Sequence, residues 1–373
     1  MHIIKISCVV YLLLAISVSA NTNRSGLPSK KAGNSKNNPP ELLLVKSYPK
    51  PVITNRMPEA GSNKFGFEGG RVIKINNIYH LFTSEMVADP CWVKMKLGYW
   101  QSKDKINWQR ISTIKESSGN FNGQDTRASL WSPLPVFDKN ENRWNLFYVA
   151  YRSAPNETDR FLLNHDGRIY RAVSSKKGRE GIAGPYADVG IVMQPDAESQ
   201  PWEGLQGVDS FFPYKVGNKW YAFYGSAKTE EKPIKLWTAG LASAPSIGGP
   251  WKRMPQGNPT NIEDVFFENA IVHPLKTGGY MLVYDAADSE DAIGYSYSKD
   301  GLNWQKGKHL IIQSKKGEWS KDVRTPLGLV EEGNNRFTIF YTGFEQDPEW
   351  EAFLAGKVVK TCAIGYAEVQ LEP

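Results

Sequence analysis

Cysteine, histidine and long apolar runs are all scarce in this sequence. Three cysteines and five histidines occur among 373 residues, and no CxxC pair or Cys/His cluster predicts a zinc site. No loop has the Asp/Asn spacing of a calcium site, so neither a metal nor another cofactor is expected. No apolar run reaches the roughly 18 residues of a transmembrane helix. Helical periodicity is nearly absent as well, which indicates an all-β fold.

The N-terminus has the features of a secretory signal peptide. Lys5 supplies a positive charge, residues 8–16 form an apolar run too short for a membrane anchor, and residues 17–20 are small. We expect residues 1–20 to be cleaved, leaving a secreted or periplasmic protein with no membrane attachment. Residues 21–40 contain mostly Asn, Ser, Lys, Gly and Pro, a composition that predicts a disordered linker.

Charge and cysteine content exclude some partners and leave one question open. The formal net charge is +6, but the basic residues are dispersed without interleaved aromatics, so no nucleic-acid partner is expected. The positive charge alone weakly favours acidic ligands. After signal cleavage Cys91 and Cys362 remain, one in the first and one in the last repeat described below. They form either a disulfide or two buried thiols.

A hairpin of two β-rich runs, followed by a third strand and in several copies by a short fourth, recurs along the chain. The second run of each hairpin alternates aromatic and aliphatic residues, as expected for a strand buried on both faces. A β-sandwich would not repeat this unit at intervals of about 55 to 80 residues. We therefore predict a single-domain five-bladed β-propeller over residues 41–373, with hairpins at 69–85, 130–153, 208–227, 267–286 and 323–344.

Polar or aromatic residues stand at the start of each predicted hairpin. In a propeller the first strand of each blade lines the axial channel, and its N-terminal end faces the mouth of the central funnel. Side chains at these starts should therefore converge on one pocket. The residues in question are Glu68, Trp131, Asp209, Glu268 and, in the fifth repeat, Asp322 with Arg324.

The carboxyl groups, the arginine and the indole at these strand starts are suited to glycoside hydrolysis. One carboxylic acid donates a proton to the leaving oxygen, while a second, ionised carboxylate activates water or attacks the sugar. A further carboxylate raises the pKa of the acid, and an arginine keeps its neighbour ionised. The flat face of Trp131 offers a surface for a sugar ring.

Several short motifs resemble those of glycoside hydrolase family 43 and its five-bladed relatives, families 32, 62, 68 and 117. The resemblance extends over nearly all of residues 60–370. Trp131-Ser132-Pro133 is similar to the WAP motif of the second blade in that family. Val208-Asp209 resembles a segment of the third blade, and Phe267-Glu268-Asn269-Ala270 resembles one of the fourth.

The resemblance implies a role for each catalytic candidate. Glu268 takes the place of the general acid, and Asp209 that of the aspartate that tunes the acid and orients the substrate. The family has an aspartate as the first-blade base, whereas this chain has Glu68. The longer side chain would change the separation of the carboxyl groups, on which the inverting outcome implied by the family depends.

Further residues are expected to bind the substrate. Arg71, Trp131, Asp322 and Arg324 are the candidates for sugar contacts, and Arg324 resembles a substrate-contacting arginine of the family. Three tryptophans in loops at the expected funnel mouth either stack on sugars or pack their loops. They are Trp92, Trp202 and Trp350.

The sequence thus predicts a glycosidase that removes a terminal sugar, for example an arabinofuranoside, from a plant or algal polysaccharide or an oligosaccharide. Two alternatives remain open. A lectin-like propeller would bind carbohydrate without cleaving it. A phosphorolytic relative of the mannoside phosphorylases would hold phosphate with basic residues around the funnel, for which Arg71, Arg127 and Arg324 are the candidates.

Overall fold

The computed structural model describes residues 39–372, except 62, 235, 287–291 and 313–318. The predicted signal peptide and residues 21–38 of the predicted linker lie outside the described residues. Strands dominate the described part. Its helical elements are η1 (Pro58–Ala60), η2 (Arg179–Ala183) and α1 (Trp350–Leu354). None of the helices in this part of the chain is long and apolar enough to span a bilayer.

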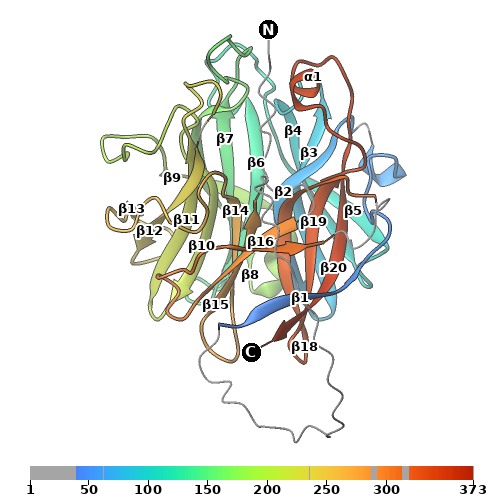
Figure 1. Cartoon of the computed structure of the whole chain (residues 1–373), viewed down its shortest axis with the longest axis vertical. Helices are drawn as coiled ribbons and strands as arrows, with labels where there is room; N and C mark the ends of the chain where they lie inside the picture. Colours follow the sequence, from blue (N-terminus) through green and yellow to red (C-terminus); the bar gives the residue numbers. More distant parts are fainter. Residues whose placement is uncertain (1–38, 62, 235, 287–291, 313–318, 373) are drawn as a thin grey trace, which may run out of the picture. The chain divides into compact units, whose positions relative to one another are not determined.

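The strands form five antiparallel four-stranded blades, as predicted (Figure 1). Blades 1 and 2 consist of β2 (Gly66–Ile75), β3 (Ile78–Ala88), β4 (Lys94–Ser102) and β5 (Trp108–Glu116), then β6 (Ser129–Asp138), β7 (Arg143–Arg152), β8 (His165–Lys177) and β9 (Tyr186–Met193). Blades 3 and 4 consist of β10 (Asp209–Val216), β11 (Lys219–Ala227), β12 (Trp237–Ala244) and β13 (Lys252–Arg253), then β14 (Glu268–Pro274), β15 (Tyr280–Asp285), β16 (Ala292–Ser298) and β17 (Lys308–Ile311).

The fifth blade combines both ends of the described chain. Three of its strands are C-terminal, and the fourth is the first strand of the domain, which pairs with β20 from Glu41↔Glu372 to Ser47↔Ala367. In Figure 1 this strand runs in blue beside the red β20. The sequence pattern did not identify it as a blade strand. The blade consists of β18 (Asp322–Gly333), β19 (Arg336–Phe344), β20 (Cys362–Glu372) and β1 (Glu41–Ser47).

The first strands of the five blades form a closed ring. Each of β2, β6, β10, β14 and β18 contacts the next, and β18 contacts β2. Large side chains fill the space between blades, as where Phe147 of blade 2 meets Phe211 of blade 3 with ring centroids 5.3 Å apart. This arrangement confirms the five-bladed propeller and places the starts of the inner strands around one axis.

Cys91 and Cys362 are both buried, free thiols, so the disulfide alternative is wrong and the alternative of two buried thiols is confirmed. Burial raises the pKa of each thiol above its ordinary value. The first and fifth blades are instead joined by a backbone pairing, in which Gly66 of β2 lies parallel to Cys362 of β20.

Gly66 is required at this junction for steric reasons. Its φ is +94°, and a Cβ atom there would lie 1.8 Å from the carbonyl oxygen of Cys362. Because the obstructing atom belongs to the backbone of a paired strand, it cannot move aside cheaply. Gly333 offers a matched comparison, since its φ is +95° and a Cβ atom there would have no other atom within 4 Å.

We predict that Gly66→Ala lowers the free energy of unfolding by roughly 3 kcal/mol or more. Gly333→Ala should cost only the backbone strain, about 1–3 kcal/mol. Urea denaturation of the two variants measures the difference. Equal losses would show that the blade junction does not depend on this close approach.

Candidate active site

The five inner strands share a break in their pairing, just after the residues predicted to face the funnel. The register shifts after Glu68, Trp131, Asp209, Glu268 and Val323. A β-bulge of this kind bends the strand and redirects a side chain. In blades 1 to 4 the next residue has positive φ, namely Gly69, Ser132, Ser210 and Asn269.

The residues at these bulges are connected around the axis. The side-chain oxygen of Asn269 accepts hydrogen bonds from the hydroxyls of Ser132, at 3.3 Å, and Ser210, at 3.5 Å. Its amide nitrogen donates to the Thr325 hydroxyl at 3.3 Å. Four blades are thereby linked directly beneath the predicted catalytic residues. Left-handed φ values at serine and asparagine store strain that this network helps to offset.

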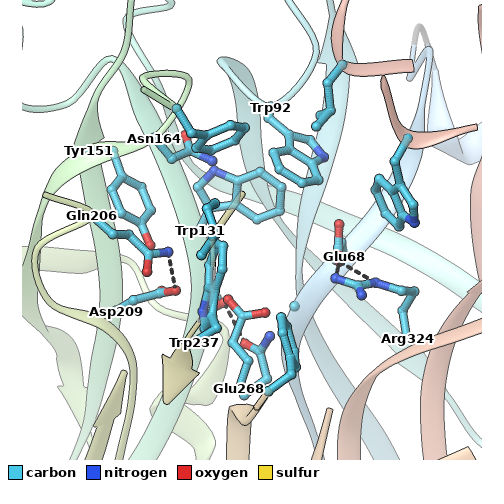
Figure 2. A pocket seen from close by; sticks show the side chains of 18 residues that line it. Glu68, Trp92, Trp131, Tyr151, Asn164, Gln206, Asp209, Trp237, Glu268 and Arg324 are labelled. Atoms are coloured by element: carbon cyan, nitrogen blue, oxygen red, sulfur yellow. Dashed lines mark hydrogen bonds and ion pairs between the residues drawn. The ribbon is translucent and has the colours of Figure 1, made fainter. Parts of the chain in front are cut away.

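A cavity of about 270 Å³ opens above this floor (Figure 2). Five of the residues predicted from the strand starts line it: Glu68, Trp131, Asp209, Glu268 and Arg324. They come from all five blades, although more than 250 residues separate the first from the last. The structure therefore brings the predicted carboxyl groups, indole and guanidinium together.

Glu68 and Arg324 form a buried ion pair on one side of the cavity. Both the Nε and an Nη of Arg324 donate to Oε1 of Glu68, at 3.3 and 3.2 Å. The same guanidinium lies 3.5 Å from Asp285, a buried carboxylate that the sequence analysis missed. Burial raises the pKa of Glu68, whereas the positive charge of Arg324 opposes this rise by favouring the ionised form. Its second oxygen, Oε2, is buried without a hydrogen-bond partner and so can accept a proton from a ligand or from water.

Glu268 has a different environment. Burial raises its pKa well above the ordinary value of 4.5, and repulsion by Asp209, together with a hydrogen bond to Asp209, raises it further. Arg324 opposes this effect only weakly. The two glutamates of this cavity thus differ in their surroundings, since Asp209 raises the pKa of Glu268 and the cation of Arg324 lies against Glu68.

Asp209 is held in place beside Glu268. It is 3 % exposed, and its carboxylate accepts hydrogen bonds from the Gln206 side-chain amide at 3.0 Å and from the Ser210 backbone at 2.6 Å. The hydroxyl of Tyr151 hydrogen-bonds the same carboxylate, which helps to raise the pKa of that tyrosine. In Figure 2, Tyr151 and Gln206 both point toward Asp209.

Two residues expected to bind substrate lie outside the cavity lining. The Arg71 guanidinium donates to the Pro135 carbonyl at 2.9 Å and lies 4.9 Å from the Phe212 ring centroid, because its side chain packs between blades. Asp322 precedes the bulge of β18, and its charge acts on Arg324 from outside the cavity. The expectation that Arg71 and Asp322 contact the sugar is therefore corrected.

The aromatic residues divide in a similar way. Trp92 and Trp350 line the cavity, whereas Trp202 packs against Tyr224 with ring centroids 5.4 Å apart. Several other lining residues were not predicted from the sequence, because they follow no repeat and come from later strands or from loops. These are Tyr151, Phe161, Asn164, Gln206, Ile234, Trp237, Phe266 and Leu354. Gln206 alone could have been anticipated, since it lies in a loop assigned to the funnel mouth.

Among the described residues, no group of three or more His, Cys, Asp or Glu side chains is arranged to hold a metal ion. The lining offers a carboxyl group whose pKa is raised well above the ordinary value, a second carboxyl group beside a guanidinium, and flat apolar walls.

No protein-family model matches this chain, and no curated protein matches it in sequence. Solved structures do. A family 117 glycoside hydrolase produced by the marine bacterium Zobellia galactanivorans has a TM-score of 0.57 and 14% identity, covering 89% of this chain and 90% of that one. The α-L-arabinofuranosidase from Lactobacillus brevis has a TM-score of 0.54 and 13% identity, covering 86% and 92%.

A GH43_1 enzyme from Xanthomonas citri complexed with xylose has a TM-score of 0.52 and 13% identity, covering 86% of this chain and 90% of that one. The expected likeness to the propellers of families 43 and 117 is confirmed for the fold. At these identities the likeness carries no residue roles.

We predict that Glu268→Gln is more stable than the wild type at pH 8. Because the folded protein raises the pKa of Glu268 well above 4.5, it holds a proton that the unfolded chain releases above about pH 4.5. The contribution of this group to stability is therefore complete below pH 4.5 and is lost as pH rises through the folded pKa, by roughly 1.4 kcal/mol per pH unit.

Glutamine cannot ionise, so the variant does not lose this contribution to stability as the pH rises. Thermal unfolding of both proteins between pH 4.5 and pH 8 should show a difference that grows with pH in favour of the variant. A constant difference across this range would contradict the raised pKa.

Proposed function

We propose that this protein is a secreted or periplasmic glycoside hydrolase that removes a terminal sugar from an oligosaccharide or polysaccharide. The observation that carries the proposal is the pair of unlike glutamates in one cavity. Glu268 has its pKa raised well above the ordinary value, and Glu68 is ion-paired to Arg324 with one oxygen free. Glycoside hydrolysis requires this division between an acid and an ionised carboxylate.

In the proposed reaction Glu268 donates its proton to the glycosidic oxygen as the bond to the sugar breaks. The leaving group departs as an alcohol, which avoids an alkoxide. Oε2 of Glu68 accepts a proton from water, and the water oxygen bonds to the sugar carbon. Asp209 favours the protonated form of Glu268 until transfer, and Arg324 favours the ionised form of Glu68 against the effect of burial.

The small cavity supports action on a chain end. Its volume of about 270 Å³ is just below the usual range for small-molecule sites, and indole rings from Trp92, Trp131, Trp237 and Trp350 line it. Such a pocket suits one sugar ring, because indole faces pack against its C–H groups. The similar structures include an α-L-arabinofuranosidase and an enzyme complexed with xylose, so a terminal pentose remains our candidate sugar.

The phosphorolytic alternative loses its support. Of its three candidate arginines, Arg71 packs between blades, and Arg127 pairs with Asp188 at 3.0 Å outside the cavity lining. Arg324 is already shared by Glu68 and Asp285. No observation favours the lectin-like alternative, since binding alone does not need a carboxyl group with a strongly raised pKa.

The proposal predicts hydrolysis of at least one member of a panel of aryl glycosides and pectic or algal oligosaccharides. Glu268→Gln and Glu68→Gln should each lower kcat on oligosaccharides by roughly 10²- to 10⁴-fold. Glu345→Gln, which alters an ion pair with Arg56 outside the cavity, is the matched control and should retain activity. NMR of the fresh product gives its anomeric configuration.

Binding without turnover across the panel would favour the lectin-like alternative. Full activity of Glu268→Gln on natural oligosaccharides would show that another group is the acid.

A further inference from the structure

We propose that the terminal sugar is uncharged, and that its hydroxyl groups are recognised by a row of hydrogen-bond acceptors formed by Asn164, Gln206 and Asp209, here called the acceptor wall. This inference rests on the proposed function and names the side chains that recognise its sugar. In Figure 2 the three residues lie on the same side of the cavity, opposite Glu68 and Arg324.

The acceptor wall has two amide oxygens without partners. Asn164 is 8 % exposed and Gln206 is 2 % exposed, yet Oδ1 of Asn164 and Oε1 of Gln206 have no hydrogen-bond donor. A buried acceptor left unpaired costs free energy, so such atoms in a cavity indicate where a ligand donates. Both residues line the cavity.

The orientation of Gln206 follows from its neighbour. The NH₂ group of Gln206 faces Asp209 and donates a hydrogen bond to its carboxyl oxygen at 3.0 Å. The amide oxygen is thereby directed elsewhere. A ligand that meets this oxygen has to bring a donor.

The cavity lining also contains hydrogen-bond donors without partners. The indole N–H groups of Trp92 and Trp237 are buried in the cavity lining without partners. A sugar hydroxyl both donates and accepts, so hydroxyls can satisfy the acceptor wall and the indoles together. A carboxylate or sulfate group can only accept, so it would leave Asn164 or Gln206 unpaired wherever it replaced the hydroxyl facing that residue.

The charges around the cavity also favour an uncharged sugar. Glu68, Asp209 and Glu268 line the cavity, and Asp285 lies behind Arg324. Among the described residues of the lining, Arg324 is the single basic side chain. It is paired with Glu68 and Asp285. A negatively charged sugar would therefore meet repulsion from these carboxyl groups, and the one cation among the described lining residues is already paired. The net charge of +6, which weakly favoured acidic ligands, resides elsewhere on the protein.

The experiment compares nitrophenyl glycosides in matched pairs, in both anomeric forms: galactoside with galacturonide, and glucoside with glucuronide, with arabinosides and xylosides added as neutral pentoses. The neutral substrates should have kcat/KM values at least about 100-fold above those of the uronides. Faster turnover of a uronide than of every neutral glycoside would overturn this inference and leave the proposed hydrolase standing. Absence of turnover across this panel and the oligosaccharides would overturn the proposed function itself.

Variants of Asn164 test the acceptor wall on the best neutral substrate. Asn164→Leu has nearly the same size but lacks the acceptor, and it should raise KM about tenfold or more while kcat changes less. Asn164→Lys introduces a cation and should raise the uronide-to-neutral ratio of kcat/KM about tenfold above that of Asn164→Leu.

Asn140, in the exposed turn between β6 and β7, provides matched controls. Asn140→Leu and Asn140→Lys make the same changes outside the cavity lining and should leave both KM and the ratio unaltered. A merely structural role of Asn164 would lower activity in both of its variants without changing the ratio. That result, with correctly folded proteins by circular dichroism, would overturn the proposed recognition.

Discussion

The cavity gathers more carboxyl groups than its one guanidinium can neutralise, and this imbalance governs its chemistry. Arg324 lies against Glu68 and Asp285, so it stabilises the ionised form on that side. Glu268, beside Asp209, is buried and repelled by that carboxyl group, and both effects raise its pKa. In the proposed reaction, the difference between acid and base arises from the distribution of charge around residues of the same type.

Backbone geometry makes this concentration of charge possible. The inner strands break their pairing just after the funnel-facing positions, and three non-glycine residues there take left-handed φ values. Hydrogen bonds between Asn269 and residues at the bulges of three other blades hold the floor together. The site therefore depends on closure of the ring, in which β1 completes the blade that carries Arg324.

The sequence predicted the repeats and the strand starts well, because both follow a local pattern. Glu68, Asp209 and Glu268 were found through their common place in successive hairpins. Asp285 was missed since it ends a second strand and reaches the site through the pairing Glu268↔Asp285. β1 was missed because a lone strand has no repeat to mark it. Arg71 was misplaced because position in a strand does not reveal which way a long side chain turns.

The proposed division between acid and base depends on the position of Glu268 beside Asp209 in one cavity, where its pKa is raised. Carbon NMR titration of protein labelled at the glutamate carboxyl carbons, with Glu268→Gln to assign the signal, measures this pKa directly. We predict a pKa well above 4.5 for Glu268, and a lower value in Asp209→Asn, where the repulsion is removed. A pKa near 4.5, or one that Asp209→Asn leaves unchanged, would contradict the account.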